Sequence, residues 1–253
     1  MIRAATPADR DAAVALWQSC DLTRPWNDPD ADFDSRYTRA TAARIVTRVG
    51  AGEPVLELGC ATGIMTAALA AAGARVTAVD RSGAYLERAR ARGLAGARFV
   101  EARLDAPGWE ERVGDGFRHV LACNLIHEVP DPAGLLARAA ALMGPDGELH
   151  LSLQNPRSIH RLVAMEMGLI DDARQVSARG RRFATLGMWD ADELMELAWE
   201  AGLRTVAREG VMLKPLPNDM MAALPADVLD GFERAARHLP EHCAMTYLVL
   251  RAR

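Results

Sequence analysis

The feature that most constrains this chain is a strand that leads into a turn bracketed by two glycines and then into a helix. Residues 55–63 read Val-Leu-Glu-Leu-Gly-Cys-Ala-Thr-Gly, and a second strand-like run at 74–79 ends just before Asp80. Gly59 and Gly63 let the backbone leave the strand sharply, which opens main-chain N–H groups at a helix start to a ligand. Because parallel strands end at one sheet edge, Asp80 should face the same crevice, where its carboxylate can accept both hydroxyls of a ribose. The pattern predicts a nucleoside site.

The residues between the two glycines indicate which kind of nucleoside is bound. Dinucleotide sites follow G-x-G-x-x-G, in which the second glycine makes room for a pyrophosphate, whereas Cys60, Ala61 and Thr62 all carry a Cβ atom. Glu57 adds a carboxylate just upstream, which suits a cationic amino-acid tail better than a polyphosphate. The loop therefore favours a nucleoside with a positively charged tail.

Strand and helix patterns alternate through the rest of the chain, which predicts an α/β fold with a doubly wound, mostly parallel sheet covered on both faces. A mostly helical stretch follows Asn155, and a second helical insertion is expected near 217–238. The expected strands are 55–58, 74–79, 97–100, 117–122, 148–153, 203–211 and 245–251, and the expected helices include 36–50, 62–72, 83–92, 132–143 and 191–201.

The glycine loop, Asp80 and the run Cys-Asn-Leu-Ile-His-Glu-Val-Pro-Asp-Pro at 123–132 together resemble class I S-adenosylmethionine-dependent methyltransferases, over residues 36–253. The resemblance implies a seven-stranded Rossmann-like sheet with an antiparallel last strand and helical insertions after strands five and six. It implies S-adenosylmethionine as cofactor and S-adenosylhomocysteine as product. The cofactor-binding residues that it implies are Glu57, Gly59, Cys60, Ala61, Thr62, Gly63, Asp80, Arg81, Leu104, Asp105 and Asn124.

The resemblance also distributes the parts of the cofactor among these residues. Glu57 and the two glycines would hold the methionine moiety, Asp80 the ribose, and Arg81 would flank the adenine. One position departs from the pattern, because many relatives have an aspartate after the third strand that receives the adenine amino group, and Arg103 stands here. A backbone contact from Leu104, or Asp105 in a shifted role, is expected to replace it.

His127 and Glu128, after the fourth strand, are the candidate catalytic pair. Methyl transfer is an in-line displacement that needs a base only when the acceptor arrives protonated. His127 could act as that base with Glu128 orienting it, or it could cap the next turn or pack beneath the cofactor. The loop is similar to that of ubiquinone-type O-methyltransferases, whose Glu-x-x-Glu-His corresponds to Asn124 through Glu128. That cluster can hold a divalent cation, but with only two good ligands here we expect no metal.

The acceptor is expected to lie over the carboxyl edge of the sheet, against the insertion after the fifth strand. The predicted substrate contacts are Asn155, His160, Arg161 and Met165. Met167, Leu169 and Ile170 would either complete an apolar lining or belong to an ordinary core. Arg174, Arg179, Arg181 and Arg182 would either grip an anionic substrate or form a solvated face.

The first 35 residues look like a separate N-terminal strand and helix segment, ahead of a methyltransferase domain at 36–253. A helix start at 6–9 and the turn-rich run Leu-Thr-Arg-Pro-Trp-Asn-Asp at 22–28 resemble the opening of Gcn5-related N-acetyltransferases, up to Phe33. That family's acetyl-CoA loop does not follow, so we interpret the segment as a structural remnant that packs as a lid or edge.

Charge and cysteine content narrow the function classes. A net charge of −4 excludes a polybasic nucleic-acid protein, and four cysteines without C-x-x-C predict neither a disulfide scaffold nor a zinc site. The chain shows no signal-peptide core and no apolar membrane span, so a cytoplasmic bacterial protein without a membrane partner is expected. The predicted function is methylation of an O or N atom on a small-molecule metabolite. The alternatives are carboxyl methylation of a modified tRNA nucleoside and a non-catalytic S-adenosylmethionine-binding protein; the oligomeric state stays open.

Overall fold

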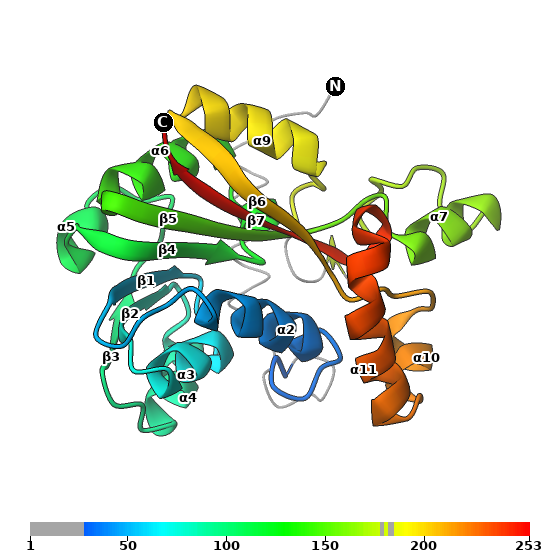
Figure 1. Cartoon of the computed structure of the whole chain (residues 1–253), viewed down its shortest axis with the longest axis horizontal. Coiled ribbons are helices and arrows are strands. Elements are labelled where there is room, and N and C mark those ends of the chain that lie inside the picture. Colours follow the sequence, from blue (N-terminus) through cyan, green and yellow to red (C-terminus); the bar gives the residue numbers. More distant parts are fainter. Residues whose placement is uncertain (1–27, 178–179, 182–184) are drawn as a thin grey trace.

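A seven-stranded sheet in the order β3-β2-β1-β4-β5-β7-β6 forms the centre of the computed structural model (Figure 1). The structure describes residues 28–177, 180–181 and 185–253. The strands are β1 (Pro54–Leu58), β2 (Arg75–Asp80), β3 (Ala97–Glu101), β4 (Phe117–Cys123), β5 (Met143–Gln154), β6 (Leu203–Val211) and β7 (Met245–Ala252). Only β7 runs antiparallel to both of its neighbours, β5 and β6. The predicted doubly wound sheet with an antiparallel last strand is confirmed.

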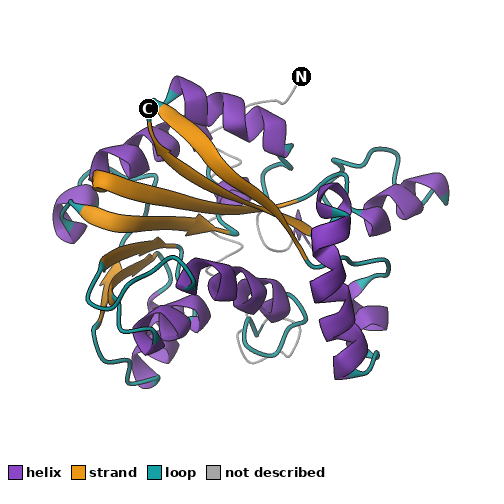
Figure 2. Ribbon diagram, in the orientation of Figure 1, coloured by secondary structure: helices purple, strands orange, loops and turns teal. Residues whose placement is uncertain are grey.

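Helices cover both faces of the sheet (Figures 1 and 2). In the figures α2 and α3 lie on one side of it, α6 and α9 lie on the other, and α7, α10 and α11 extend past one end. Their bounds are α2 (Ser35–Val46), α3 (Ile64–Ala71), α4 (Gly83–Ala91), α5 (Glu110–Val113), α6 (Pro132–Leu142), α7 (Ile159–Glu166), α9 (Ala191–Glu200), α10 (Asn218–Ala222) and α11 (Ala226–Ala235). Short 3-10 turns are η2 (Ile126–Glu128), η3 (Ala236–His238) and η4 (Pro240–His242).

Two apolar cores form because the central strands are buried on both faces. Along β4, Val120 and Ala122 belong to the core on one face, and Leu121 belongs to the core on the other. Successive side chains of a strand point to opposite faces, so a strand covered on both sides reads as a nearly continuous apolar run. This is why β1 and β4 are recognisable in the sequence.

The element boundaries differ from the expected ones at a few places. The strand β5 begins at Met143, directly after α6, rather than at residue 148, and α2 ends at Val46 rather than near residue 50. The short helix α5 was not predicted, because four residues carry too little periodicity to recognise. The expected insertion at 217–238 is split into α10 and α11 around Pro225.

The N-terminal predictions lie mostly outside the described residues. The acetyltransferase-like opening falls on residues 1–27, so that resemblance and the division at residue 35 stay predictions. None of the helices in the described part of the chain combines the length and apolar character that a bilayer span requires.

Candidate active site

A cavity of about 760 Å³ opens at the carboxyl ends of β1, β2 and β4. The strand order reverses between β1 and β4, and open α/β sheets bind their ligands at such a switch point. The glycine loop, the segment 28–38 and the insertions after β5 and β6 all contribute to its lining. Its volume lies within the range of roughly 300 to 1,000 Å³ that small-molecule sites occupy.

The glycine loop needs its two glycines for both conformation and space. Gly59 and Gly63 have φ values of 75° and 79°, in the left-handed region that disfavours residues with a Cβ. A Cβ at Gly59 would lie 3.1 Å from Leu125 Cδ1, and one at Gly63 would lie 3.1 Å from Ala89 Cβ. Between them Ala61 is also left-handed, with φ 45°. The sequence Gly-Cys-Ala-Thr-Gly therefore folds into a tight turn beneath the cavity.

Most of the N–H groups of this loop are already bonded within the protein, which corrects the expectation that they face a ligand. The N–H groups of Gly59 and Cys60 both donate to the carbonyl of Val79, and that of Gly63 donates to the carbonyl of Cys60. The N–H of Ala61 donates to Asp80 Oδ2 at 2.8 Å. The loop thus serves a ligand mainly through its shape, while the carboxylates beside it supply the polar contacts.

Asp80 closes β2 with a carboxylate fixed from two sides. Its Oδ2 accepts from Ala61 N and its Oδ1 accepts from Ser82 N, each at 2.8 Å. Each carboxylate oxygen has two lone-pair sites, so both oxygens keep one for a ligand in the cavity. Burial raises the pKa of Asp80, while the two backbone N–H groups lower it. The geometry fits the predicted ribose contact.

Glu57 lies deeper, on β1, with 4% of its surface exposed. Thr66 Oγ1 donates to Glu57 Oε2 at 2.6 Å. Burial raises the pKa of Glu57 to about 8, so the free protein holds this carboxyl largely protonated at neutral pH. A cationic group in the cavity would favour the ionised form, which is the property expected of a site for an ammonium group.

The predicted adenine side is formed by Arg81, Leu104 and Asp105, all of which line the cavity. Arg103 donates two hydrogen bonds to the Asp105 carboxylate, at 3.1 and 2.7 Å. These bonds hold the pKa of Asp105 below its usual value. Arg103 therefore positions Asp105 at the cavity.

His127 and Glu128 lie in η2 and line the cavity beside the glycine loop. Their closest side-chain atoms, His127 Nε2 and Glu128 Oε1, are 3.7 Å apart. That is too long for a hydrogen bond, so Glu128 does not orient the imidazole through one. The helix α6 that follows is capped by Asp131, whose carboxylate accepts from Gly134 N. His127 Nδ1 is buried and has no hydrogen-bond partner among the described residues.

Burial gives the two side chains opposite pKa shifts. It lowers the pKa of His127 to about 4 and raises the pKa of Glu128 to about 8. At neutral pH the imidazole is thus neutral and the carboxyl largely protonated. A neutral imidazole at a cavity wall can accept a proton from a ligand.

Asn124 is held in place at the end of β4 by β5. Its backbone is left-handed, with φ 54°, and its N–H donates to the carbonyl of Ser152 at 2.9 Å. Ser152 Oγ donates to Asn124 Oδ1 at 3.1 Å. Asn124 lines the cavity, as predicted, with its amide oriented by this serine.

Three of the four predicted substrate contacts line the cavity, namely Asn155, His160 and Arg161. Asn155 has its amide committed, because Nδ2 donates to the carbonyls of Glu241 and Cys243. Arg161 donates to the carbonyls of Ala173 and Gln175, which braces the following loop. Both residues therefore shape the wall.

Met165 is not among the residues that line the cavity, which corrects that prediction. On α7 the lining residues are His160, Arg161 and Ala164, and each step along a helix rotates the side chain by about 100°. Met165 follows Ala164 and is turned past this face. Met167 and Leu169 are 66% and 68% exposed, so of the expected apolar lining only Ile170 reaches the cavity.

Of the four arginines expected either to grip an anionic substrate or to form a solvated face, the structure describes Arg174 and Arg181. Arg174 bonds Glu193 Oε1 at 2.8 Å, and Arg181 bonds the carbonyl of Val176 at 2.6 Å. Neither lines the cavity, which favours the solvated-face interpretation for these two. Arg179 and Arg182 lie outside the described residues.

Sequence reasoning missed an acidic wall and a buried cation. Asp28, Asp32 and Asp34, before α2, line the cavity, as does Lys214, which donates to Asn218 Oδ1 at 2.5 Å. The repeated aspartates in a turn-rich stretch were the available signal. Lys214 also stands out as the single lysine among 30 basic residues.

Known proteins resemble this chain in sequence. A family model described as a methyltransferase domain matches residues 33–208. The chain belongs to this family. The ubiquinone biosynthesis O-methyltransferase of Pseudomonas aeruginosa is 31% identical over 231 residues, covering 86% of this chain and 93% of that relative.

Solved structures share the fold at lower sequence identity. The 1,6-didemethyltoxoflavin-N1-methyltransferase of Burkholderia thailandensis has a TM-score of 0.62 at 20% identity, covering 98% of this chain and 91% of that one. The magnesium protoporphyrin IX methyltransferase of Synechocystis has a TM-score of 0.60 at 14% identity, covering 96% of each chain. Both structures contain S-adenosylhomocysteine, and this methyltransferase uses S-adenosylmethionine.

Proposed function

We propose that this methyltransferase transfers a methyl group to a hydroxyl oxygen of a small-molecule metabolite, and that His127 takes the hydroxyl proton. The observation that carries the proposal is the neutral, largely buried imidazole of His127, which lines the cavity. A hydroxyl needs such a base, whereas a carboxylate acceptor does not. The ubiquinone biosynthesis O-methyltransferases, about 30% identical, support an oxygen acceptor.

The residues around the cavity fit the cofactor in separate parts. Asp80 presents two oriented oxygens for the ribose, and Glu57 offers a buried carboxyl for the ammonium group. Leu104 and the braced Asp105 lie where the adenine is expected. Bound S-adenosylmethionine supplies a methyl group on a positively charged sulfur. The chain's own contribution is to hold the acceptor oxygen in line and to exclude water.

His127 then carries the proton chemistry. The imidazole accepts the hydroxyl proton as the oxygen becomes nucleophilic, which leaves an imidazolium beside Glu128. Because the two side chains are 3.7 Å apart, the positive charge favours loss of the Glu128 proton. Glu128 thus stabilises the protonated His127 by charge rather than by a hydrogen bond.

A cytoplasmic setting belongs to the same proposal. Cys60, Cys123 and Cys243 are free thiols, which fits a reducing compartment. Asp28, Pro29, Asp32, Asp34 and Ser35 line the cavity, which supports the proposal that the N-terminal segment 1–35 acts as a lid on the domain at 36–253.

The test combines an acceptor panel with a variant of the base. Purified protein and S-adenosylmethionine are incubated with phenols and catechols, with matched amines and carboxylic acids, and with bulk tRNA, and S-adenosylhomocysteine is quantified. We expect turnover of at least one hydroxyl acceptor and a loss of about 10²- to 10⁴-fold in His127→Gln. The control is His238→Gln, at an exposed histidine, which should leave turnover unchanged. Methylation confined to amines, acids or tRNA, or full activity of His127→Gln, would contradict the proposal.

A further inference from the structure

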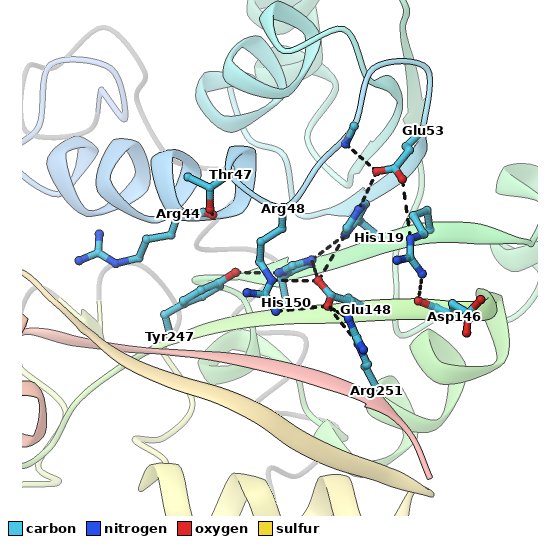
Figure 3. A network of polar contacts seen from close by, with 12 residues as sticks. Arg44, Thr47, Arg48, Glu53, His119, Asp146, Glu148, His150, Tyr247 and Arg251 are labelled. Carbon is cyan, nitrogen blue, oxygen red and sulfur yellow. Dashed lines mark hydrogen bonds and ion pairs between the residues drawn. The ribbon is translucent and has the colours of Figure 1, made fainter.

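A second cluster of ionisable side chains lies on the sheet face beneath α2, outside the cavity lining (Figure 3). His119 on β4 and Glu148 and His150 on β5 are 1%, 3% and 0% exposed. We propose that these three residues form a binding site for a divalent transition-metal ion of the Zn²⁺ type. The proposal is independent of the methyl-transfer chemistry.

Strand register brings the three side chains together. His119 on β4 pairs with Glu148 on the parallel strand β5, and His150 follows two residues later, on the same face. The facing atoms are His119 Nδ1, His150 Nε2 and Glu148 Oε2. Rigid neighbouring strands therefore present two imidazole nitrogens and one carboxylate oxygen to a single point.

The distances between these atoms suit one ion. His119 Nδ1 lies 2.9 Å from His150 Nε2 and 3.9 Å from Glu148 Oε2, and His150 Nε2 lies 3.7 Å from that oxygen. A point equidistant from all three is about 2.1 Å from each, close to the roughly 2.0 to 2.2 Å of Zn–N and Zn–O bonds. This point lies in the plane of the three atoms, so a tetrahedral ion with a fourth ligand requires the two imidazole nitrogens to move apart and Glu148 Oε2 to move closer.

In each histidine, the ring nitrogen that points away from the proposed ion has a polar partner, as is usual for histidines that bind a metal. Glu53 Oε2 lies 3.1 Å from His119 Nε2, and Tyr247 Oη lies 2.8 Å from His150 Nδ1 (Figure 3). Ligating histidines almost always give their second N–H to a carboxylate, carbonyl or other acceptor, which fixes the ring and the tautomer. Both rings are thus oriented with their remaining nitrogens toward each other, and Glu148 Oε2 lies 3.9 and 3.7 Å from them.

The Glu148 carboxylate is held by two arginines on its outer side. Arg251 donates to Oε1 at 3.0 and 2.7 Å, and Arg48 donates to Oε1 at 3.2 Å and to Oε2 at 3.0 Å. A carboxylate oxygen has two lone-pair sites, so Oε2 keeps one toward the histidines. The side chains of Arg48 and Arg251 are 32% and 43% exposed, and solvent therefore screens their repulsion of a cation.

A hydrogen-bonded chain without an ion is the competing arrangement. In it Tyr247 donates to His150, His150 to His119, and His119 to Glu53, and every nitrogen is satisfied. Glu148 takes no part in that chain, and Arg48 and Arg251 hold its Oε2 at 3.9 and 3.7 Å from the inner nitrogens, where an ion would use it as the third ligand. On binding, the His150 proton moves from Nε2 to Nδ1 and points to the Tyr247 oxygen, and the two rings separate by a few tenths of an ångström.

The experiment uses the full chain after treatment with a chelator. Co²⁺ or Zn²⁺ chloride is added alone, without cofactor or acceptor, and binding is followed by the visible absorption of four-coordinate Co²⁺, by metal analysis and by thermal melting. We expect one equivalent to bind and the Tm to rise by roughly 5 to 10 °C at a hundredfold excess over Kd. His150→Gln should abolish both signals, and His238→Gln should leave them unchanged.

Tyr247→Phe guards against a variant that merely fails to fold. It keeps the ring and all three ligands but removes the acceptor of His150, so metal affinity should fall by about 10- to 100-fold while the chelated protein still melts cooperatively. Absence of stoichiometric binding by the wild-type chain would overturn the proposal. Binding that survives His150→Gln, or that His127→Gln removes, would place the ion elsewhere and would also overturn it.

Discussion

Thr62 Oγ1, in the glycine loop, donates a 2.6 Å hydrogen bond to Asp30 Oδ1, in the turn before α2. Arg92 donates to the same aspartate oxygen at 2.8 Å and to the Thr62 carbonyl at 2.6 Å. Arg88 donates to Asp30 Oδ2 at 2.8 Å. These contacts fasten the N-terminal segment, which supplies the acidic wall of the cavity, to the loop beneath the cofactor site.

Removing this fastening should weaken cofactor binding. Asp30→Ala breaks a hydrogen bond between a hydroxyl and a carboxylate, the class that contributes about 1.5 to 3 kcal/mol, so we expect S-adenosylhomocysteine affinity to fall by roughly tenfold. The measurement is calorimetric titration with S-adenosylhomocysteine. Asp115→Ala, at an exposed aspartate, serves as the matched control. Equal affinities in the two variants would show that the segment does not hold the loop.

Cofactor binding should depend on pH through Glu57. Its pKa is about 8 in the free protein because of burial, and a nearby ammonium group would lower it. Binding below pH 8 therefore releases a proton, so affinity should rise with pH by up to tenfold per unit from pH 6 to pH 8. The measurement is the Kd of S-adenosylhomocysteine across this range.

The raised pKa of Glu57 affects the stability of the free protein in the opposite direction: stability should fall as the pH rises, whereas cofactor affinity should increase. The folded pKa of Glu57 lies above its unfolded value, so the stability that the neutral carboxyl contributes is present below about pH 4.5 and is lost as the pH rises through about 8.

The variant Glu57→Gln tests the prediction for binding, because it should flatten the pH dependence of cofactor affinity. If the affinity of Glu57→Gln still rose with pH in the same way, the proton released on cofactor binding would come from another group.

The pH profile of turnover should reflect the unusual environment of His127. Burial lowers its pKa to about 4, so the imidazole is already neutral at pH 5. At saturating cofactor we expect kcat to stay within about twofold from pH 7 down to pH 5, whereas a base with the ordinary pKa of about 6.5 would lose more than tenfold. The measurement is initial rate against pH with the best acceptor of the panel. An acidic limb centred near pH 6.5 would contradict the burial argument.

The sheet and the expected cofactor-binding residues could be predicted from the sequence because each depends on residues close together in the chain. A strand buried on both faces is mostly apolar, and the turn out of β1 has glycines at two of its three left-handed positions, Gly59 and Gly63. Asp80 was predictable because it ends a strand that neighbours that turn. The position of each of these residues follows from the residues next to it in the chain.

The acceptor side was less predictable because its geometry depends on contacts between distant segments. Met165 was a reasonable choice by composition, but the rotation of α7 turned Ala164 inward instead. Neither the bond of Asp30 to Thr62 nor the convergence of His119 with His150 leaves a pattern in one sequence, because each pair joins segments about 30 residues apart. Such contacts are set by tertiary packing.

A single methyl group added in the glycine loop should destabilise the protein. Gly63 precedes α3 with φ 79°, and its Cβ would lie 3.1 Å from the Cβ of Ala89. A residue with a side chain in the left-handed region costs roughly 1 to 2 kcal/mol, so Gly63→Ala should lower the Tm by about 2 to 8 °C and weaken cofactor binding.

Gly231 provides the matched control within the same chain. It lies inside α11, a methyl group added there would meet no neighbouring atom within 4 Å, and its φ is not in the left-handed region. Alanine favours a helix interior over glycine by about 0.5 to 1 kcal/mol, so Gly231→Ala should raise the Tm by roughly 1 to 4 °C. The measurement is the Tm of both variants. Equal Tm changes would show that the left-handed backbone at residue 63 does not require glycine.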